Sequence, residues 1–194
     1  GEDRETTIID GGQNGRVVYM EQGSYHVNIS NFTIRNGYAD HAAGVKISSN
    51  VSATLNDLNI INNNCPGDGA GIQIVGSESV VINNCLIDNN TGQNGGGILL
   101  INTVVNIDSS IINNNIANNQ GGGIFIENSD CNINNTRIEG NTVGHDGAAI
   151  ILWNSTCDLE SSKIKYNNAN NNGVIFSRDN SVLNIEKTEF SYND

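Results

Sequence analysis

Residues Gly121–Asn141 read GGGIFIENSDCNINNTRIEGN, and the rest of the chain repeats this stretch at intervals of about 26 residues. Aligning the copies produces a column of aliphatic residues that are 25 to 27 positions apart. Its members are Val18, Val45, Ile72, Ile98, Ile124, Ile150 and Ile175. A fixed period of this length indicates stacked repeats, each of which is too small to bury its own apolar face. The chain is therefore predicted to be a solenoid.

Each period contains three short segments in which apolar and polar residues alternate. In the quoted copy these segments are centred on residues 124–126, 131–133 and 136–138. Alternation with a period of two is typical of β-strands and not of an amphipathic helix. Because side chains alternate between the two faces of a strand, the apolar parity shared by all copies marks the face that points into the core. The pattern predicts three strands per turn.

Two polar columns accompany these strands. A turn between the first and second strands is predicted at Gly23–Ser24, Gly76–Ser77, Asn102–Thr103, Asn128–Ser129, Asn154–Ser155 and Asn180–Ser181, because Gly and Asn tolerate positive φ. After the third strand a second column contains Asn63, Asn90, Asn115, Asn141, Asn167 and Asn193. In coils stacked at about 4.8 Å, the amides of this second column are expected to bond one another as a ladder.

These features predict an all-β, right-handed parallel β-helix of about seven turns with three strands per turn, in a single domain over residues 1–194. Thr6–Gly11 is predicted to be the last strand of an incomplete turn, with Ile8 aligned on Ile34. Solenoids normally cover the open strand edges at their ends with a cap. The sequence is therefore predicted to be a piece of a longer protein.

The net charge of −12 argues against a nucleic-acid partner, because nucleic acids bind to basic surfaces. No apolar run approaches the length of a membrane span, so this segment is not expected to insert into a membrane. Cys131 and Cys157 are 26 residues apart in one inward column and are predicted to be stacked free thiols. The sequence has no CxxC motif or Cys/His cluster for a structural zinc.

Several short motifs resemble those of known β-helix proteins. The stretches Gly95–Ile98, Gly121–Ile124 and Gly147–Ile150, with Ile112–Asn115, Ile138–Asn141, Ile164–Asn167 and Phe190–Asn193, resemble the GGAI and FxxN repeats of polymorphic outer-membrane proteins. The segments Gly1–Gly11 and Val27–Gly37 are similar to secreted right-handed β-helix proteins of the pectate-lyase-like superfamily. The resemblance implies an extracellular or cell-surface protein whose usual role is adhesion or contact with glycans.

No catalytic residue is assigned. Related lyases use acidic residues that converge beside a basic residue, and related hydrolases use closely spaced acids, but the sequence has no Asp-Asp pair and no such cluster. The corner column Asp68, Asn94, Gln120 and Asp146 offers oxygen ligands for calcium. Neutral amides separate its two acids, so turn-forming side chains are the favoured interpretation, and no cofactor or metal ligand is assigned.

An apolar stripe is the one feature that suggests a binding site. The outward positions of the first strand change from polar in the early turns to apolar and aromatic in the last four turns. The apolar stripe comprises Leu99, Ile101, Phe125, Ile151, Trp153 and Phe176. Exposed aromatic side chains on a flat sheet suit the faces of sugars or a partner protein.

The sequence therefore favours a non-catalytic secreted or surface domain that binds a glycan or a surface protein through the apolar stripe. One alternative is that another domain of the parent chain covers the stripe. A second alternative is a polysaccharide lyase or glycoside hydrolase, which rests on the resemblance alone. A third is a rigid spacer or filament segment that stacks end to end.

Overall fold

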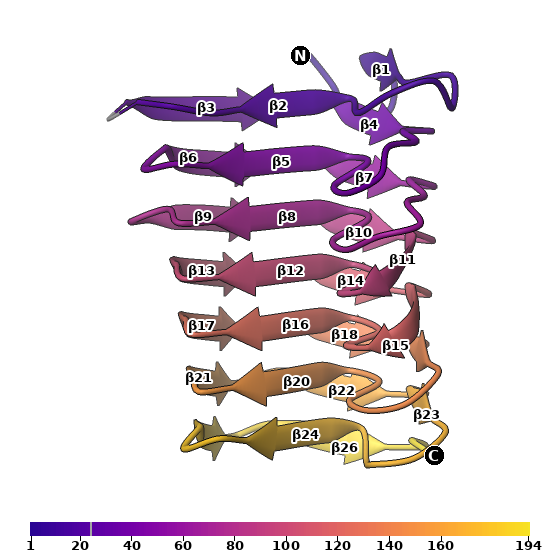
Figure 1. Ribbon diagram of the computed structural model, residues 1–194, viewed down its shortest axis with the longest axis vertical. Coiled ribbons are helices and arrows are strands. Elements are labelled where there is room, and N and C mark those ends of the chain that lie inside the picture. The colour runs from indigo at the N-terminus through magenta and orange to yellow at the C-terminus, as the bar shows by residue number, and fades with distance from the viewer. Residues whose placement is uncertain (24) are drawn as a thin grey trace.

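The computed structural model describes residues 1–23 and 25–194 and shows a rod of coils stacked along one axis, with the two termini at opposite ends (Figure 1). The regular secondary structure of these residues consists of strands alone. All strand pairs are parallel, and each strand pairs with its copy in the neighbouring coil. The long sheets contain seven or eight strands, which confirms the predicted all-β solenoid of about seven turns.

Three sheets, numbered in chain order, run the length of the rod and enclose its core. Sheet 1 contains β2 (Val18–Met20), β5 (Val45–Ser48), β8 (Ile72–Val75), β12 (Ile98–Ile101), β16 (Ile124–Glu127), β20 (Ile150–Trp153) and β24 (Ile175–Arg178). Sheet 2 contains β3 (His26–Ser30), β6 (Ser52–Asn56), β9 (Val80–Asn83), β13 (Val104–Asp108), β17 (Asp130–Asn134), β21 (Thr156–Glu160) and β25 (Val182–Glu186). Sheet 3 contains β1 (Ile8–Asp10), β4 (Thr33–Arg35), β7 (Asn59–Ile61), β10 (Leu86–Asp88), β14 (Ile111–Asn113), β18 (Arg137–Glu139), β22 (Lys163–Lys165) and β26 (Glu189–Ser191).

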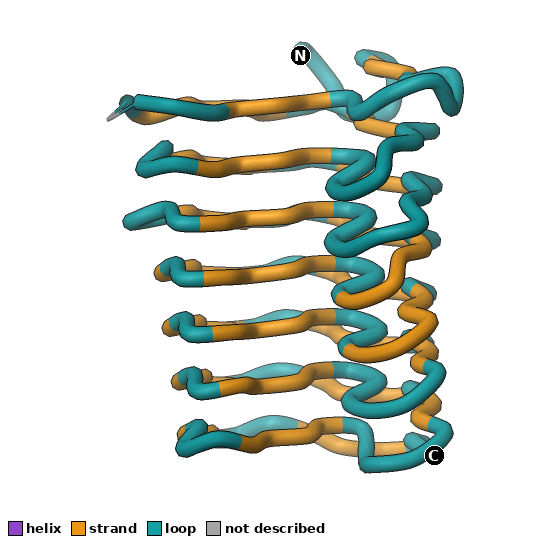
Figure 2. The backbone as a smooth tube through the Cα atoms, viewed as in Figure 1, coloured by secondary structure: helices purple, strands orange, loops and turns teal. Residues whose placement is uncertain are grey.

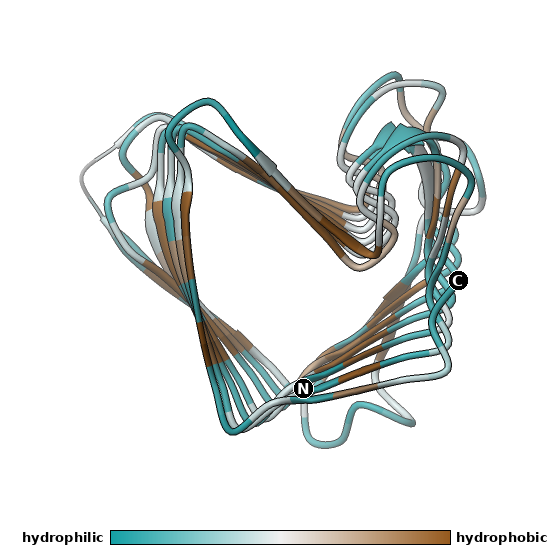
Figure 3. Cartoon of the chain, turned by 90° about the horizontal axis from the view of Figure 1, so that it is seen from below, coloured by the Kyte–Doolittle hydropathy of each residue, from teal (hydrophilic) through white to brown (hydrophobic). Residues whose placement is uncertain are grey.

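A fourth, short sheet adds one strand in four of the coils to the three strands per turn that were predicted. Sheet 4 contains β11 (Thr91–Asn94), β15 (Ile116–Gln120), β19 (Thr142–Val143) and β23 (Asn168–Ala169). Its residues look like loop in the sequence because they are rich in Asn and Gly. Their backbone groups nevertheless bond from coil to coil, as Thr142 N does to Asn115 O at 2.9 Å, with a shift of register between β11 and β15. Viewed along the rod, the segment of each coil that leads from sheet 3 to the next strand of sheet 1 curls back on itself (Figure 3). We call this segment, which includes the strands of sheet 4 and the glycines that follow them, the hook.

The inward columns of sheets 1 to 3 form one continuous core, and the strand positions repeat from coil to coil (Figure 2). Ile98, Ile124 and Ile150 are partners in register on neighbouring strands, and all three are fully buried. Cys131 and Cys157 are partners in the same way and are buried free thiols, as predicted. A hydrogen bond with Cys157, together with burial, raises the pKa of Cys131 well above its ordinary value.

The predicted asparagine ladder is present at the corner after sheet 3. Asn115 Nδ2 donates to Asn141 Oδ1 at 3.0 Å, and Asn141 Nδ2 donates to Asn167 Oδ1 at 3.0 Å. All three side chains are fully buried. Each amide therefore ties one coil to the next from inside the rod.

The first strand departs from the predicted register by one residue. Ile9, and not Ile8, is the partner of Ile34, while Ile8 is the partner of Thr33. A slip of one residue exchanges the two faces of a strand, so Ile9 occupies the core column. The contact of Arg35 Nε with Asp10 Oδ2 at 2.8 Å holds this register at the edge of the sheet. The predicted turn Gly23–Ser24 includes residue 24, which lies outside the described residues.

Candidate functional site

The apolar stripe is assembled, but most of it is not exposed. Leu99, Phe125 and Ile151 stack on the outer face of sheet 1 and are only 2%, 3% and 0% exposed. They form a cluster against which Ile101, Trp153 and Phe176 pack as half-buried neighbours. The expectation of an open aromatic surface is therefore wrong for the three central residues.

The hook explains this burial. Gly121 adopts a left-handed conformation with φ of 65° and lies directly over the outer face of sheet 1. A Cβ atom at Gly121 would come within 2.9 Å of Phe125 Cβ and 3.1 Å of Ile151 Cγ2. Gly95 and Gly147 take the same conformation in the neighbouring coils. The hook thus turns this outer face into a second apolar core.

Trp153, the largest member of the stripe, is already in contact with other side chains. Its ring packs edge-on against Phe125, with 5.0 Å between the ring centroids. The guanidinium carbon of Arg178 lies 3.4 Å from the centroid of the Trp153 ring, a cation–π contact. A sugar could stack on this face of Trp153 only after Arg178 had moved away.

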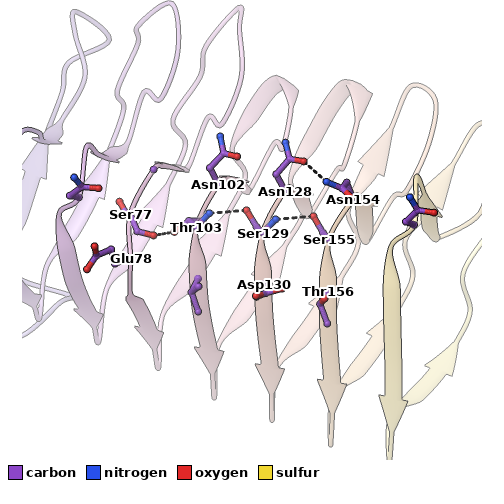
Figure 4. Close-up of a pocket in the computed structure, with 14 residues that line it drawn as sticks. Ser77, Glu78, Asn102, Thr103, Asn128, Ser129, Asp130, Asn154, Ser155 and Thr156 are labelled. Carbon is purple, nitrogen blue, oxygen red and sulfur yellow. Dashed lines mark hydrogen bonds between the residues drawn. The ribbon is translucent and has the colours of Figure 1, made fainter.

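A polar groove of about 780 Å3 lies beside the stripe, at the corner where sheet 1 passes into sheet 2 (Figure 4). Its lining repeats once per coil in three columns. The outermost column contains Asn50, Gly76, Asn102, Asn128, Asn154 and Asn180. The second contains Ser77, Thr103, Ser129 and Ser155. The third contains Val104, Asp130 and Thr156, and Glu78 from the longer preceding corner also lines the groove.

Differences in corner length give the groove its floor and ends. Three successive corners have only two residues between the strands, namely Asn102–Thr103, Asn128–Ser129 and Asn154–Ser155. The preceding corner, Gly76–Ser79, has four residues and the following corner, 179–181, has three. In Figure 2 this edge of the rod projects further in the second and third coils than in the coils after them. The groove therefore runs along the rod axis over the short corners, with a longer corner at each end.

The corner asparagines present their amides to solvent. Asn102, Asn128 and Asn154 have φ angles of 50°, 47° and 47°, in the left-handed region that Asn tolerates better than most residues. All three side chains are exposed. Asn154 Nδ2 donates to Asn128 Oδ1 at 2.8 Å. In the part of the chain that the structure describes, the Asn102 amide makes no hydrogen bond to protein, so it can bond a ligand.

A ladder of buried hydroxyls forms the rigid floor beneath these amides. Ser129 Oγ accepts a hydrogen bond from Thr103 N at 3.1 Å and donates to Glu127 O at 2.7 Å. Ser155 Oγ repeats this arrangement, accepting from Ser129 N at 3.1 Å and donating to Trp153 O at 2.7 Å. Because these groups are buried and paired, the corner backbone is held in place before any ligand binds.

The charge of the groove is negative. Glu78 and Asp130 contribute carboxylates, and the described residues that line the groove include no Lys or Arg. Sequence reasoning identified the turn chemistry of this corner but not the groove. The signal was present in the corner length, since four residues separate Val75 from Val80 but three separate the equivalent Ile101 from Val105.

The corner column considered for calcium is also assembled, on the hook. Asn94 Nδ2 donates to Asp68 Oδ1 at 2.8 Å, and Gln120 Nε2 donates to Asp146 Oδ2 at 3.2 Å. Amide-to-carboxylate bonds of this kind agree with turn-forming side chains. Residues 1–23 and 25–194 contain no group of three or more His, Cys, Asp or Glu side chains that could hold a metal ion.

These features define a parallel β-solenoid with a polar groove along one corner. The family described as right handed beta helix region matches residues 4–164, which is more than half of the chain, and the chain belongs to this family. The match and the parallel pairing together confirm the predicted right-handed parallel β-helix. Searches of curated proteins and of solved structures found no match. No helix among the described residues is long and apolar enough to cross a membrane.

Proposed function

We propose that this chain is a non-catalytic binding domain of a secreted or surface protein, and that it holds an extended glycan chain in the corner groove. The observation that carries the proposal is the repetition of the same polar groups once per coil along the groove. The resemblance to outer-membrane and secreted β-helix repeats supports the extracellular location.

The chemistry of the corner suits sugars. A side-chain amide offers both donors and acceptors, as sugar hydroxyls require. Successive coils are about 4.8 Å apart, so a polymer whose units advance by a similar distance meets an equivalent amide at each unit. The buried hydroxyl ladder fixes the backbone beforehand, which lowers the entropy lost on binding.

The exposed part of the apolar stripe borders the same groove. Ile101 directly precedes Asn102, and Trp153 directly precedes Asn154. Both side chains are half-buried and lie on the side of sheet 1. They provide an apolar rim for the C–H faces of the sugars, while the asparagines bond the hydroxyls.

The test is binding of neutral β-1,4-linked oligosaccharides by isothermal titration calorimetry to a triple variant, Asn102→Gly, Asn128→Gly and Asn154→Gly. Glycine removes the amides but keeps the left-handed backbone, as Gly76 already does in this column at φ of 62°. Each lost hydrogen bond is worth about 1 kcal/mol, so the affinity should fall roughly tenfold or more.

The matched control is the triple variant Asn62→Gly, Asn89→Gly and Asn114→Gly. These asparagines have φ angles of 56°, 53° and 50° at the corner after sheet 3, away from the groove. This variant should bind like the unmodified chain. Equal losses in the two variants, or no loss in either, would contradict the assignment of the groove. New reducing ends or unsaturated products in the same mixtures, with or without calcium, would favour the enzymatic alternative.

A further inference from the structure

The two carboxylates of the groove are spaced along its length. Glu78 belongs to the long corner at one end, and Asp130 begins β17, two coils further on. At about 4.8 Å per coil, their separation along the axis is on the order of 10 Å. Val104, which is 41% exposed, lies on the coil between them. Figure 4 shows Glu78 and Asp130 on the same side of the hydroxyl row.

A buried hydroxyl beside Glu78 is left without a partner. Ser77 lines the groove and is only 2% exposed, yet its Oγ makes no hydrogen bond within the described chain. The equivalent Oγ of Ser129 donates to a carbonyl two residues before it. The pattern breaks at Ser77, where the corner is one residue longer than the corner at Ser129 when both are measured between strand positions that are in register. Since buried polar groups are nearly always paired, Ser77 indicates a place that a ligand atom or a water molecule completes.

We infer that the groove selects a β-1,4-linked chain of amino sugars, an inference that rests on the proposed glycan-binding function. Successive sugars of such a chain are turned over relative to one another, so their 2-amino groups project to the same side only at every second sugar. One sugar advances by about the height of one coil. The spacing between amines two sugars apart therefore matches the spacing between Glu78 and Asp130 along the groove. The reversed sugar between these amines lies against Val104.

The electrostatics favour this polymer over its relatives. Protonated amines form ion pairs with Glu78 and Asp130, whereas uronic-acid polymers bring like charges to the groove and neutral chains form no ion pair. Exposed ion pairs are individually weak, so the two together should favour the amino-sugar chain by about tenfold. The preference should weaken as the salt concentration rises, because salt screens exposed charges.

The experiment compares three hexasaccharides, a glucosamine hexamer, its fully N-acetylated form and a cellohexaose, by isothermal titration calorimetry. The titrations are made at mildly acidic pH, at which the sugar amines are protonated. The glucosamine hexamer should bind about tenfold tighter than the other two at low salt. The double variant Glu78→Gln with Asp130→Asn should bind all three equally.

The control replaces a carboxylate outside the groove. Asp158→Asn removes a negative charge from sheet 2 at a residue that does not line the groove, and it should leave the preference intact. A preference that survives in the double variant would overturn the inference, because it would arise from the overall negative charge. Equal binding of the three hexasaccharides to the unmodified chain would overturn the inference and leave glycan binding standing. Binding of none of them would overturn both.

Discussion

Asn115 shows what one side chain contributes to this fold. Its Oδ1 accepts hydrogen bonds from Asn90 N and Asn90 Nδ2, both at 3.0 Å. Its Nδ2 donates to Ile87 O at 2.9 Å and to Asn141 Oδ1 at 3.0 Å. A primary amide has two donors and two lone pairs, so the hydrogen-bonding capacity of Asn115 is fully used. The side chain is completely buried, and the same bonds would be lost with any apolar replacement.

The first prediction follows from these bonds. Asn115→Ala removes the buried hydrogen bonds of Asn115 to Asn90, Ile87 and Asn141, and it should lower the free energy of unfolding by about 3 kcal/mol. The control is Asn113→Ala, which changes a half-buried outward residue of β14 and should cost at most about 0.5 kcal/mol. Urea unfolding followed by circular dichroism measures both values. Equal losses in the two variants would contradict the structural role of the ladder.

At the scale of elements, the hook is held against sheet 1 by close contact between backbone and side chains. A Cβ atom at Gly121 would lie 3.0 Å from Ile124 O and 2.9 Å from Phe125 Cβ. Gly76 has a similar φ of 62°, but a Cβ atom there would meet nothing within 4 Å. Comparing the same substitution at the two glycines therefore separates the free-energy cost of the left-handed backbone from the cost of the steric contact.

The second prediction uses this pair. Gly76→Ala should lower the free energy of unfolding by about 1 kcal/mol, the cost of a left-handed conformation for a residue with a Cβ atom. Gly121→Ala carries the same cost and in addition pushes the hook away from Phe125, for a total of about 3 kcal/mol. Urea unfolding compares the two variants. Similar losses would show that the contact with sheet 1 contributes little to stability.

At the scale of the whole molecule, the rod behaves as a sum of similar coils. Each coil contacts chiefly the coils before and after it, and its stability comes from its own packing and from these two interfaces. The coils differ in their corners but share one register, since their inward columns coincide. A whole coil should therefore be removable without disturbing the others.

The third prediction tests this additivity. Deleting Gly122–Gly147 removes one full period. The deletion joins Gly121 to Ala148, and Gly121 then takes the place that Gly147 has before Ala148 in the intact chain. The shortened chain should keep its β-sheet circular dichroism and unfold cooperatively at a lower urea concentration. Deleting only Gly122–Asn134, half a period, removes β16 and β17 and joins Gly121, which precedes sheet 1, to Asn135, which precedes sheet 3, so it should abolish cooperative unfolding. Similar behaviour of the two deletions would contradict the stacked-coil architecture.

The sequence by itself determined the coil and its interior. The recurrence of Ile98, Ile124 and Ile150, together with Asn115 and Asn141, specifies which residues point inward and where the ladder lies, because any other alignment would bury polar side chains and expose the aliphatic columns. Periodicity therefore sufficed for sheets 1 to 3, for their register beyond β1 and for the stacked thiols, but not for sheet 4.

Only the tertiary structure decided what happens on the outside of the rod. Alternation along a strand shows that Phe125 points away from the core, but not that the left-handed Gly121 folds the hook over it. In the same way, the corner asparagines form a groove only because two-residue corners stack between longer ones. The physical reason is that local patterning fixes the direction of a side chain, while its exposure depends on segments of neighbouring coils that pack beside it.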